Sequence, residues 1–370
     1  MELPDIAYLL LRLIAFLAGI FLVGYTILSG IRTFVLPRPA QVLVFRLVFL
    51  NVRRLFDLRA RQATSYLQRD QMMALYAPIA LFLVPVALMI MIMIGFMAIY
   101  WALSSLSIIE SFKLSGSSLL TLGSFINDSP WLMVFEFAEA LLGMIMVALL
   151  IAYLPTIYNA FTRRETRVQL LEVRAGAPPS PWELIARSYR TGELEQLRDF
   201  WSEWQVWFAE IEESHTSLAA LAFFRSPRPE MSWITAAGVV LDAAALMLST
   251  VDIRREPRAA FCIRSGYLSL RQIAIFFEVP SSDNPASTDP IAITRQEYED
   301  ACRYLADQGV PLLPDRVQTW RDYAGWRVNY DKELISLAAL TMAPYAPWSS
   351  DRSLSPTLRR RMSGEEGKWE

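Results

Sequence analysis

A short segment between two apolar runs contains the residues of this sequence best suited to bind an ion. The runs cover 74–103 and 131–158; between them lie a helix-compatible stretch, 104–120, and a polar stretch, 126–130. The turn that joins these stretches reads Thr121, Leu122, Gly123, Ser124, Phe125. Non-helical backbone at membrane depth occurs only where protein buries it or where it lines a water-filled path. Carbonyl oxygens of such a turn can replace the water around a cation, so this order of elements predicts a pore loop.

Two acidic residues interrupt the run 131–158. Glu136 and Glu139 lie three positions apart and therefore share one face of a helix. Carboxylates at this depth are costly and usually face a partner or an aqueous cavity. Three interpretations stay open: they attract cations into the pore mouth, they brace the turn from behind, or one of them pairs with Arg12. Arg12 lies at a similar depth in another apolar run, 6–31, and is the one charged residue there.

Two further residues of the run 131–158 can shape a helix. Gly143 lies near its middle and Pro155 near its end. A proline in a helix interior removes one hydrogen bond and bends the helix, so Pro155 predicts a kink. Gly143 is either a hinge or a small residue that permits close helix packing, which is common in membrane helices.

The length and composition place these residues in a membrane protein. The chain has 370 residues, of which 54% are hydrophobic and 19% charged. This apolar content excludes disorder over most of the chain, and two cysteines exclude a disulfide scaffold. The runs 6–31, 74–103 and 131–158 are each long enough to cross a bilayer, which needs about 20 apolar helical residues. Acidic leading residues and the length of the first run argue against a cleavable signal.

The distribution of arginine predicts the orientation. The connection 32–75 holds eight arginines, whereas the connection 104–130 holds one basic residue, Lys113. Because basic residues accumulate in cytoplasmic loops, the N-terminus is expected outside and everything after the third span in the cytoplasm. Residues 166–370 carry 23 basic and 28 acidic residues, an acidic balance that argues against a nucleic-acid partner.

The stretch from Ser117 to Phe125 resembles the pore helix and filter of the pore-loop cation channel superfamily, specifically bacterial potassium-channel-like proteins with two pore helices per subunit. The resemblance covers about residues 75–165. It implies a homotetramer in the bacterial inner membrane with a selectivity filter in which Thr121, Leu122 and Gly123 supply oxygen ligands. Ser124 stands where the family has Tyr, and Phe125 where it has a second Gly. We therefore expect a permeant monovalent cation with little discrimination between potassium and sodium. The alternative for the turn is an ordinary extracellular bend at Gly123.

Two other segments need separate interpretation. Residues 42–58 mix large apolar residues with arginines, which predicts an amphipathic helix at the inner membrane interface, or else a helix packed on the cytoplasmic domain. Residues 233–251 are apolar with one charge, Asp242. A crossing there would place four arginines outside, so we predict a buried helix of a soluble domain.

The cytoplasmic half is expected to be helical. Predicted helices begin at Pro181 and cover 193–213, 267–278, 295–308 and 317–342; residues 279–290 and the tail from 347 are expected to be loop. No dinucleotide-binding glycine motif occurs. His215, the one histidine, follows Glu212 at the spacing of a metal-ligand pair, but a capping or surface role is the expected one.

These observations combine into one prediction. The fold class is an all-α membrane protein with a peripheral helix (1–36), an interfacial helix (37–73), a pore domain with a re-entrant loop (74–162), a cytoplasmic helical domain (163–346) and a tail (347–370). The function is a cation channel for ion transport. The alternative is a non-conducting membrane anchor whose helical domain binds a partner. No enzymatic motif, cofactor or metal site is predicted; the expected partners are membrane lipids and further copies of the chain.

Overall fold

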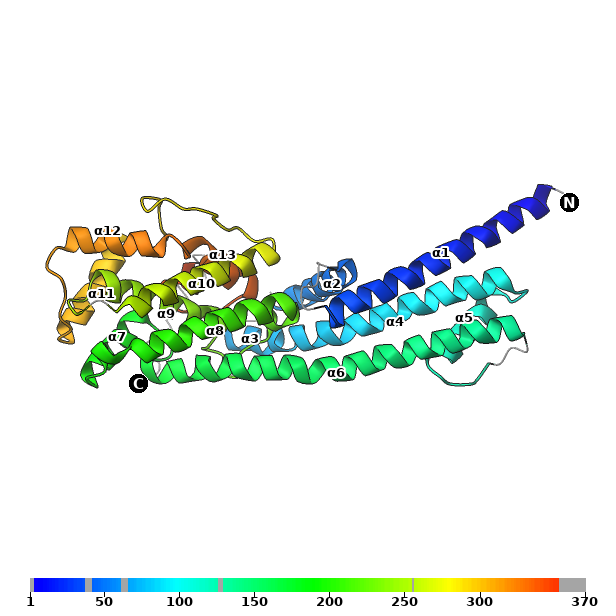
Figure 1. Ribbon diagram of the computed structural model, residues 1–370, viewed down its shortest axis with the longest axis horizontal. Helices are drawn as coiled ribbons and strands as arrows, with labels where there is room; N and C mark the ends of the chain where they lie inside the picture. The colour runs from blue at the N-terminus through cyan, green and yellow to red at the C-terminus, as the bar shows by residue number, and fades with distance from the viewer. Residues whose placement is uncertain (1–2, 37–41, 61–65, 126–128, 255, 353–370) are drawn as a thin grey trace. The chain divides into compact units, whose positions relative to one another are not determined.

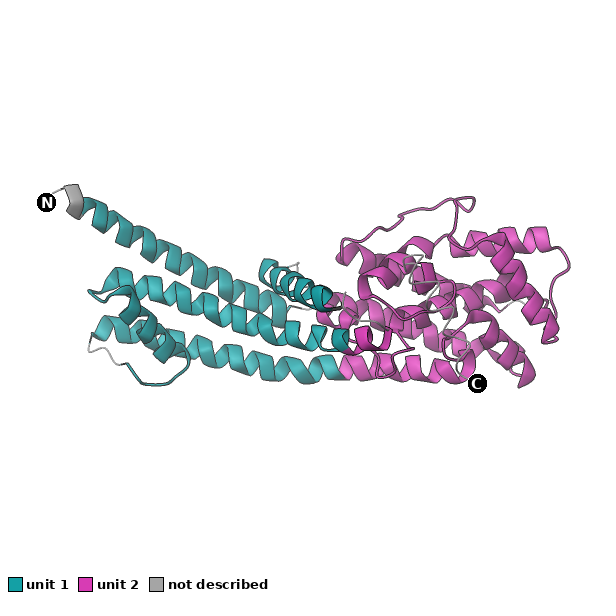
Figure 2. Ribbon diagram, turned by 180° about the vertical axis from the view of Figure 1, so that it is seen from behind, with its two compact units in different colours: residues 1–63, 72–158 teal, residues 64–71, 159–370 magenta. Residues whose placement is uncertain are grey.

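The protein is built from helices arranged in two compact units. The computed structural model describes residues 3–36, 42–60, 66–125, 129–254 and 256–352, and every regular element in these ranges is a helix (Figure 1). Unit 1 comprises residues 1–63 and 72–158, and unit 2 comprises residues 64–71 and 159–370 (Figure 2). The predicted all-α class is confirmed.

Three helices are long and apolar enough to cross a membrane, as the sequence predicts. They lie in the ranges Ile6–Phe34, Tyr66–Leu103 and Pro130–Ala175. The first range lies in α1 (Leu3–Phe34) and the third is α6 (Pro130–Ala175). The second range joins the short α3 (Tyr66–Ala74) to α4 (Tyr76–Leu103). α6 has 46 residues and continues well past the predicted end of its span at Tyr158, so one helix runs from unit 1 into unit 2.

α1 and α4 approach each other closely where two glycines meet. A Cβ atom placed on Gly19 would lie 2.6 Å from the carbonyl oxygen of Gly95, and one on Gly95 would lie 2.7 Å from Val23. Small residues let membrane helices touch through their backbones, which gains van der Waals contact in the absence of a hydrophobic driving force. These glycines therefore set the distance between α1 and α4.

The predicted amphipathic helix is α2 (Leu43–Ala60), and it belongs to unit 1. Its buried residues include Val44, Phe49 and Val52. Phe49 meets the Tyr76 ring of α4 edge to face, with ring centroids 5.9 Å apart, and the Tyr76 hydroxyl donates to the Phe49 carbonyl. α2 thus packs on α4 of the same unit, while a row of leucines on its other side is exposed: Leu43, Leu47, Leu50 and Leu58.

Unit 2 is a helical domain that surrounds one apolar helix. Its elements after α6 are α7 (Pro181–Arg190), η1 (Leu194–Gln196), α8 (Arg198–Ser217), η2 (Ala219–Phe223), α9 (Trp233–Ser249), α10 (Pro257–Phe276), α11 (Arg295–Asp307), α12 (Arg316–Arg327), α13 (Asp331–Thr341) and η3 (Ser350–Arg352). Every residue of α9 except Leu248 is buried. This confirms the prediction that 233–251 holds a buried helix; the solubility of its domain stays a prediction.

Four predictions about unit 2 are wrong. The predicted helix 193–213 is divided into η1 and α8, and α8 continues to Ser217. α10 begins at Pro257, because Glu256 caps it and a proline at the first helical position favours a start there. The predicted helix 317–342 is two helices, because the Asn329 amide donates to the carbonyls of Gly325 and Trp326 and competes with the backbone bonds that would continue α12.

The fourth correction concerns the tail, which was expected to be loop. Residues 347–352 pack into unit 2, and 353–370 lie outside the described residues. The Trp348 side chain is buried between the rings of Trp182 and Tyr323, at centroid distances of 5.1 and 5.6 Å. The composition of the tail does not predict this packing, because the packing depends on residues far away in the sequence.

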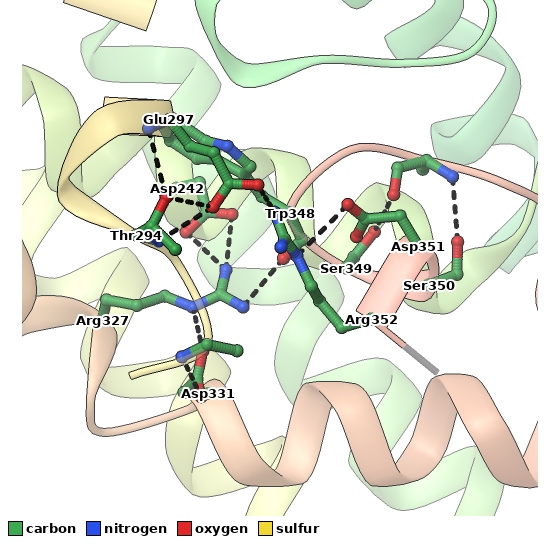
Figure 3. A network of polar contacts seen from close by, with 12 residues as sticks. Asp242, Thr294, Glu297, Arg327, Asp331, Trp348, Ser349, Ser350, Asp351 and Arg352 are labelled. Atoms are coloured by element: carbon green, nitrogen blue, oxygen red, sulfur yellow. Dashed lines mark hydrogen bonds and ion pairs between the residues drawn. The ribbon is translucent and has the colours of Figure 1, made fainter. Parts of the chain in front are cut away.

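A buried ion pair joins α9, α12 and this C-terminal segment (Figure 3). Arg327 is fully buried and donates to both carboxylate oxygens of Asp242, at 2.8 and 2.6 Å, to Asp331 and to the Trp348 carbonyl. Tyr330 also donates to Asp242. Burial raises the pKa of Asp242, while the Arg327 charge opposes that shift. Because each charge has several partners, the pair stays compatible with a dry interior.

Replacing Gly19 with leucine should force α1 away from α4. Overpacking of this kind costs about 1–3 kcal/mol, and we expect a lower melting temperature of the detergent-solubilised protein. Gly24 is the matched control because no atom lies within 4 Å of a Cβ placed there. Equal melting temperatures for Gly19→Leu and Gly24→Leu would contradict the role given to the glycine contact.

Candidate functional site

The candidate site is the loop that follows α5 (Ile108–Leu119) in unit 1. The helix begins four residues later than expected, because the Ser107 hydroxyl accepts from the Glu110 N–H and the Glu110 carboxylate accepts from the Ser107 N–H. This capping box satisfies the free N–H groups at the start of α5. The structure thus places a short capped helix between α4 and α6, directly before the predicted filter residues.

The backbone of the loop folds back onto the end of α5. Thr121 and Gly123 have left-handed φ values of 54° and 62°, the first of which is unusual for a residue with a side chain. The Thr121 N–H donates to the Ser118 carbonyl at 3.0 Å and the Leu122 N–H to the Ser117 carbonyl at 2.8 Å. Alternating positive φ values therefore produce a tight turn at the predicted positions.

One side chain holds the second half of the loop. The Ser117 hydroxyl accepts hydrogen bonds from the N–H groups of Ser124 and Phe125, at 3.0 and 3.2 Å. Four of the five N–H groups of the predicted filter thus point toward α5. Within the described residues, no hydrogen bond is made to the carbonyl oxygens of Thr121, Leu122 and Gly123, and all three residues are exposed in the single chain. These oxygens are the groups that could coordinate a cation.

Glu139 lies behind the loop and does not face solvent. It is fully buried between α4, α5 and α6, where the Tyr100 hydroxyl donates to its Oε2 atom at 2.8 Å. Its Oε1 atom lies 2.5 Å from the Ser115 hydroxyl of α5. Of the three interpretations of the acidic pair, this geometry favours the brace for Glu139. Tyr100, Ser115 and Ser117 were not expected from the sequence, since Ser and Tyr are common in helices and no spacing marks them as partners.

Glu136 and Arg12 are not paired with each other in the structure. Arg12 donates to the Ser104 carbonyl at 2.7 Å and lies over the rings of Tyr8 and Trp101. Glu136 is half-buried, and its Oε1 atom has no hydrogen-bond partner among the described residues. The backbone carbonyl at the end of α4 thus replaces the carboxylate that we considered as the partner of Arg12. A role of Glu136 in the ion path stays a prediction.

Gly143 brings α6 into contact with the end of α5. A Cβ atom at this position would lie 2.2 Å from the Leu119 carbonyl oxygen, so only glycine fits. This is the packing role considered for Gly143; a hinge role stays a prediction. Pro155 lies inside the continuous helix α6, where its missing N–H leaves the Ile151 carbonyl without a helical partner.

His215 lies in the interior of unit 2, so the expected surface or capping role is wrong. The Arg164 guanidinium lies 3.3 Å from its Nε2 atom and can only donate, so Nε2 must accept and the proton sits on Nδ1, near the Ser214 hydroxyl. Burial, and then the Arg164 charge, hold the pKa of His215 well below its usual value. The Glu212 carboxylate accepts a hydrogen bond from the Ser269 hydroxyl. Glu212 is therefore engaged by Ser269 rather than paired with His215 as the spacing of a metal-ligand pair suggests.

Compared with protein-family models, curated proteins and solved structures, the chain shows no match. Its functional interpretation therefore rests on the geometry of α4, α5, α6 and the loop. In that geometry, a capped helix precedes a turn in which four N–H groups donate to residues of α5 and the carbonyl oxygens of Thr121, Leu122 and Gly123 accept no hydrogen bond from the described residues.

Replacing Gly143 with alanine should displace the end of α5 and the loop. The added methyl group overlaps a backbone oxygen, so we expect a cost of about 1–3 kcal/mol and a lower melting temperature. Gly116→Ala is the matched control, because the nearest atom to a Cβ there is the Met93 sulfur at 4.0 Å. If both variants melt together with the parent protein, the Gly143 contact does not position α5.

Acidification should destabilise unit 2 through His215. Unfolded His215 takes up a proton below about pH 6.5, whereas the folded form stays neutral, so stability falls as the pH decreases, by up to about 1.4 kcal/mol per pH unit. His215→Gln keeps an acceptor for Arg164 and cannot titrate. Thermal unfolding between pH 7.5 and 5 should therefore depend less on pH in this variant than in the parent. Identical pH dependence in the two proteins would contradict a neutral buried histidine.

Proposed function

We propose that four copies of this chain form a channel that conducts monovalent cations. The observation that carries the proposal is the loop 120–125, in which Ser117 and the end of α5 accept N–H groups and leave the carbonyl oxygens unengaged by the described residues. Rings of such backbone oxygens replace the hydration shell of a cation. The loop belongs to the same unit as the helices long enough to cross a membrane, which is where an ion path is needed.

One loop per chain requires several chains around the ion path. A symmetric ring is the usual way in which identical subunits close around an axis. The loop is accessible to further copies, because Thr121, Leu122 and Gly123 are exposed in the single chain, Leu122 by 65%. The number four comes from the resemblance of 117–125 to pore-loop channels, which implies a homotetramer.

Selectivity is expected to be weak. The intact part of the filter resemblance ends at Gly123, and Ser124 and Phe125 direct their N–H groups to Ser117. Fewer rings of oxygens leave fewer sites that prefer a dehydrated potassium ion over sodium. The proposed channel therefore passes both ions.

The resemblance of 117–125 implies the bacterial inner membrane, and the arginine distribution supports an orientation with unit 2 on the cytoplasmic side. In this orientation the exposed leucines of α2 face the inner interface, where the flanking arginines reach lipid headgroups. Unit 2 is then placed to receive a cytoplasmic signal. α6 gives it a direct connection to the ion path, because the helix passes from Glu139 and Gly143 to Arg164 without a break.

Purified protein in planar bilayers should carry a cation current with similar reversal potentials for potassium and sodium and little chloride permeability. Ser117→Ala removes the acceptor for two loop N–H groups and should reduce or abolish the current, whereas Ser117→Thr keeps the hydroxyl and should conduct. Particle mass in detergent should correspond to a tetramer. A chloride current or a monomeric particle without current would contradict the channel, and the latter would favour the membrane anchor that binds a partner.

A further inference from the structure

A carboxyl group is enclosed by three helices of unit 1. Glu139 of α6 is fully buried within one chain. It contacts the Tyr100 hydroxyl of α4 through one oxygen and the Ser115 hydroxyl of α5 through the other. The Ser115 hydroxyl also lies 3.0 Å from the Met93 carbonyl of α4. Four polar groups therefore form a chain that joins α4, α5 and α6.

The charge of Glu139 decides whether this series of four polar groups has enough hydrogens for all of its hydrogen bonds. Ser115 has one hydroxyl hydrogen but lies at bonding distance from two acceptors, the Met93 carbonyl and Glu139 Oε1. If Glu139 is ionised, one of these two contacts joins acceptors only. If Glu139 carries a proton, it donates to Ser115, Ser115 donates to Met93, and Tyr100 donates to Oε2. Only the protonated acid satisfies every contact.

The charges around Glu139 lead to the same conclusion. The described ion pairs include none with Glu139, and the acidic neighbour Glu136 on α6 has the same sign. Arg12 of α1 is engaged by the Ser104 carbonyl, and Glu110 and Lys113 of α5 are exposed. A carboxylate without a cation in an apolar layer is strongly unfavourable, whereas a neutral carboxylic acid with hydrogen-bond partners is not.

We infer that Glu139 holds a proton, which it donates to Ser115, and that this neutral acid is a positioning residue for α5. The hydrogen bonds then run in one direction, from Tyr100 through Glu139 and Ser115 to the Met93 carbonyl. Loss of the proton breaks this order at Ser115, two residues before Ser117, the residue whose hydroxyl accepts the loop N–H groups. The inference uses contacts within one chain and holds whether or not the protein conducts.

Infrared spectroscopy of the full-length protein in lipid vesicles tests the proton directly. The spectrum at neutral pH should contain the C=O stretch of a protonated carboxylic acid that shifts in D2O and disappears in Glu139→Gln. Glu136→Gln is the matched control and should keep this band. Absence of the band from the parent protein, or its loss in Glu136→Gln instead, would overturn the inference.

Stability provides a second measurement that does not depend on the band. The amide introduced by Glu139→Gln can donate to Ser115 and accept from Tyr100, so this variant should melt within about 2 °C of the parent protein, whereas Glu139→Leu and Ser115→Ala should melt about 3–10 °C lower. Conversely, a large loss in Glu139→Gln, equal to that in Glu139→Leu, would show that a charge is needed and would overturn the inference. Neither test uses bilayer currents. A negative result in these tests would therefore not contradict the proposed channel, and absence of a current would not contradict a protonated Glu139.

Discussion

The structure of unit 1 depends on one constraint: polar groups within an apolar layer must find their partners inside the protein. Hydrocarbon offers no hydrogen bonds, so each unpaired N–H, C=O or carboxyl group costs several kcal/mol. The serines of α5 meet this requirement at two levels. Ser115 takes part in the contacts of Glu139, and Ser117 receives the N–H groups of Ser124 and Phe125. The described part of the chain supplies no donor to the carbonyl oxygens of Thr121, Leu122 and Gly123, and in the proposed channel a cation is their partner.

Much of unit 1 could be predicted from the sequence, because the hydrophobic effect acts on runs of residues. The three apolar runs, the helix before the turn and the turn at Gly123 all follow from length, composition and local order. The partners of the charged residues could not be predicted in this way. Arg12 and Glu136 lie at similar depths, yet Arg12 bonds the Ser104 carbonyl, because rotation of each helix about its axis decides which groups meet. Depth along a helix is readable from sequence; the direction of a side chain around it is not.

In unit 2 the same distinction applies to helix ends. The buried helix α9 was predictable, since a crossing there would place the arginines that follow it outside, against the positive-inside bias. The break between α12 and α13 was not, because Asn329 ends α12 through bonds to carbonyls one turn earlier, and nothing in the apolar pattern records them. The packing of Trp348 was likewise hidden, since its carbonyl is held by Arg327 and its ring by Trp182, more than 160 positions earlier in the chain.

The charge at the centre of α9 also matters before the protein has folded. During synthesis this 17-residue helix emerges as an apolar segment, in a chain that also holds three apolar helices long enough to cross a bilayer. An aspartate at the centre of such a segment opposes insertion by about 2.5–3.5 kcal/mol. Asp242 therefore disfavours entry of α9 into the membrane while Arg327, 85 positions later, has yet to be translated. The residue that stabilises the folded core through its ion pair thus also helps the nascent chain to sort its apolar segments between two environments.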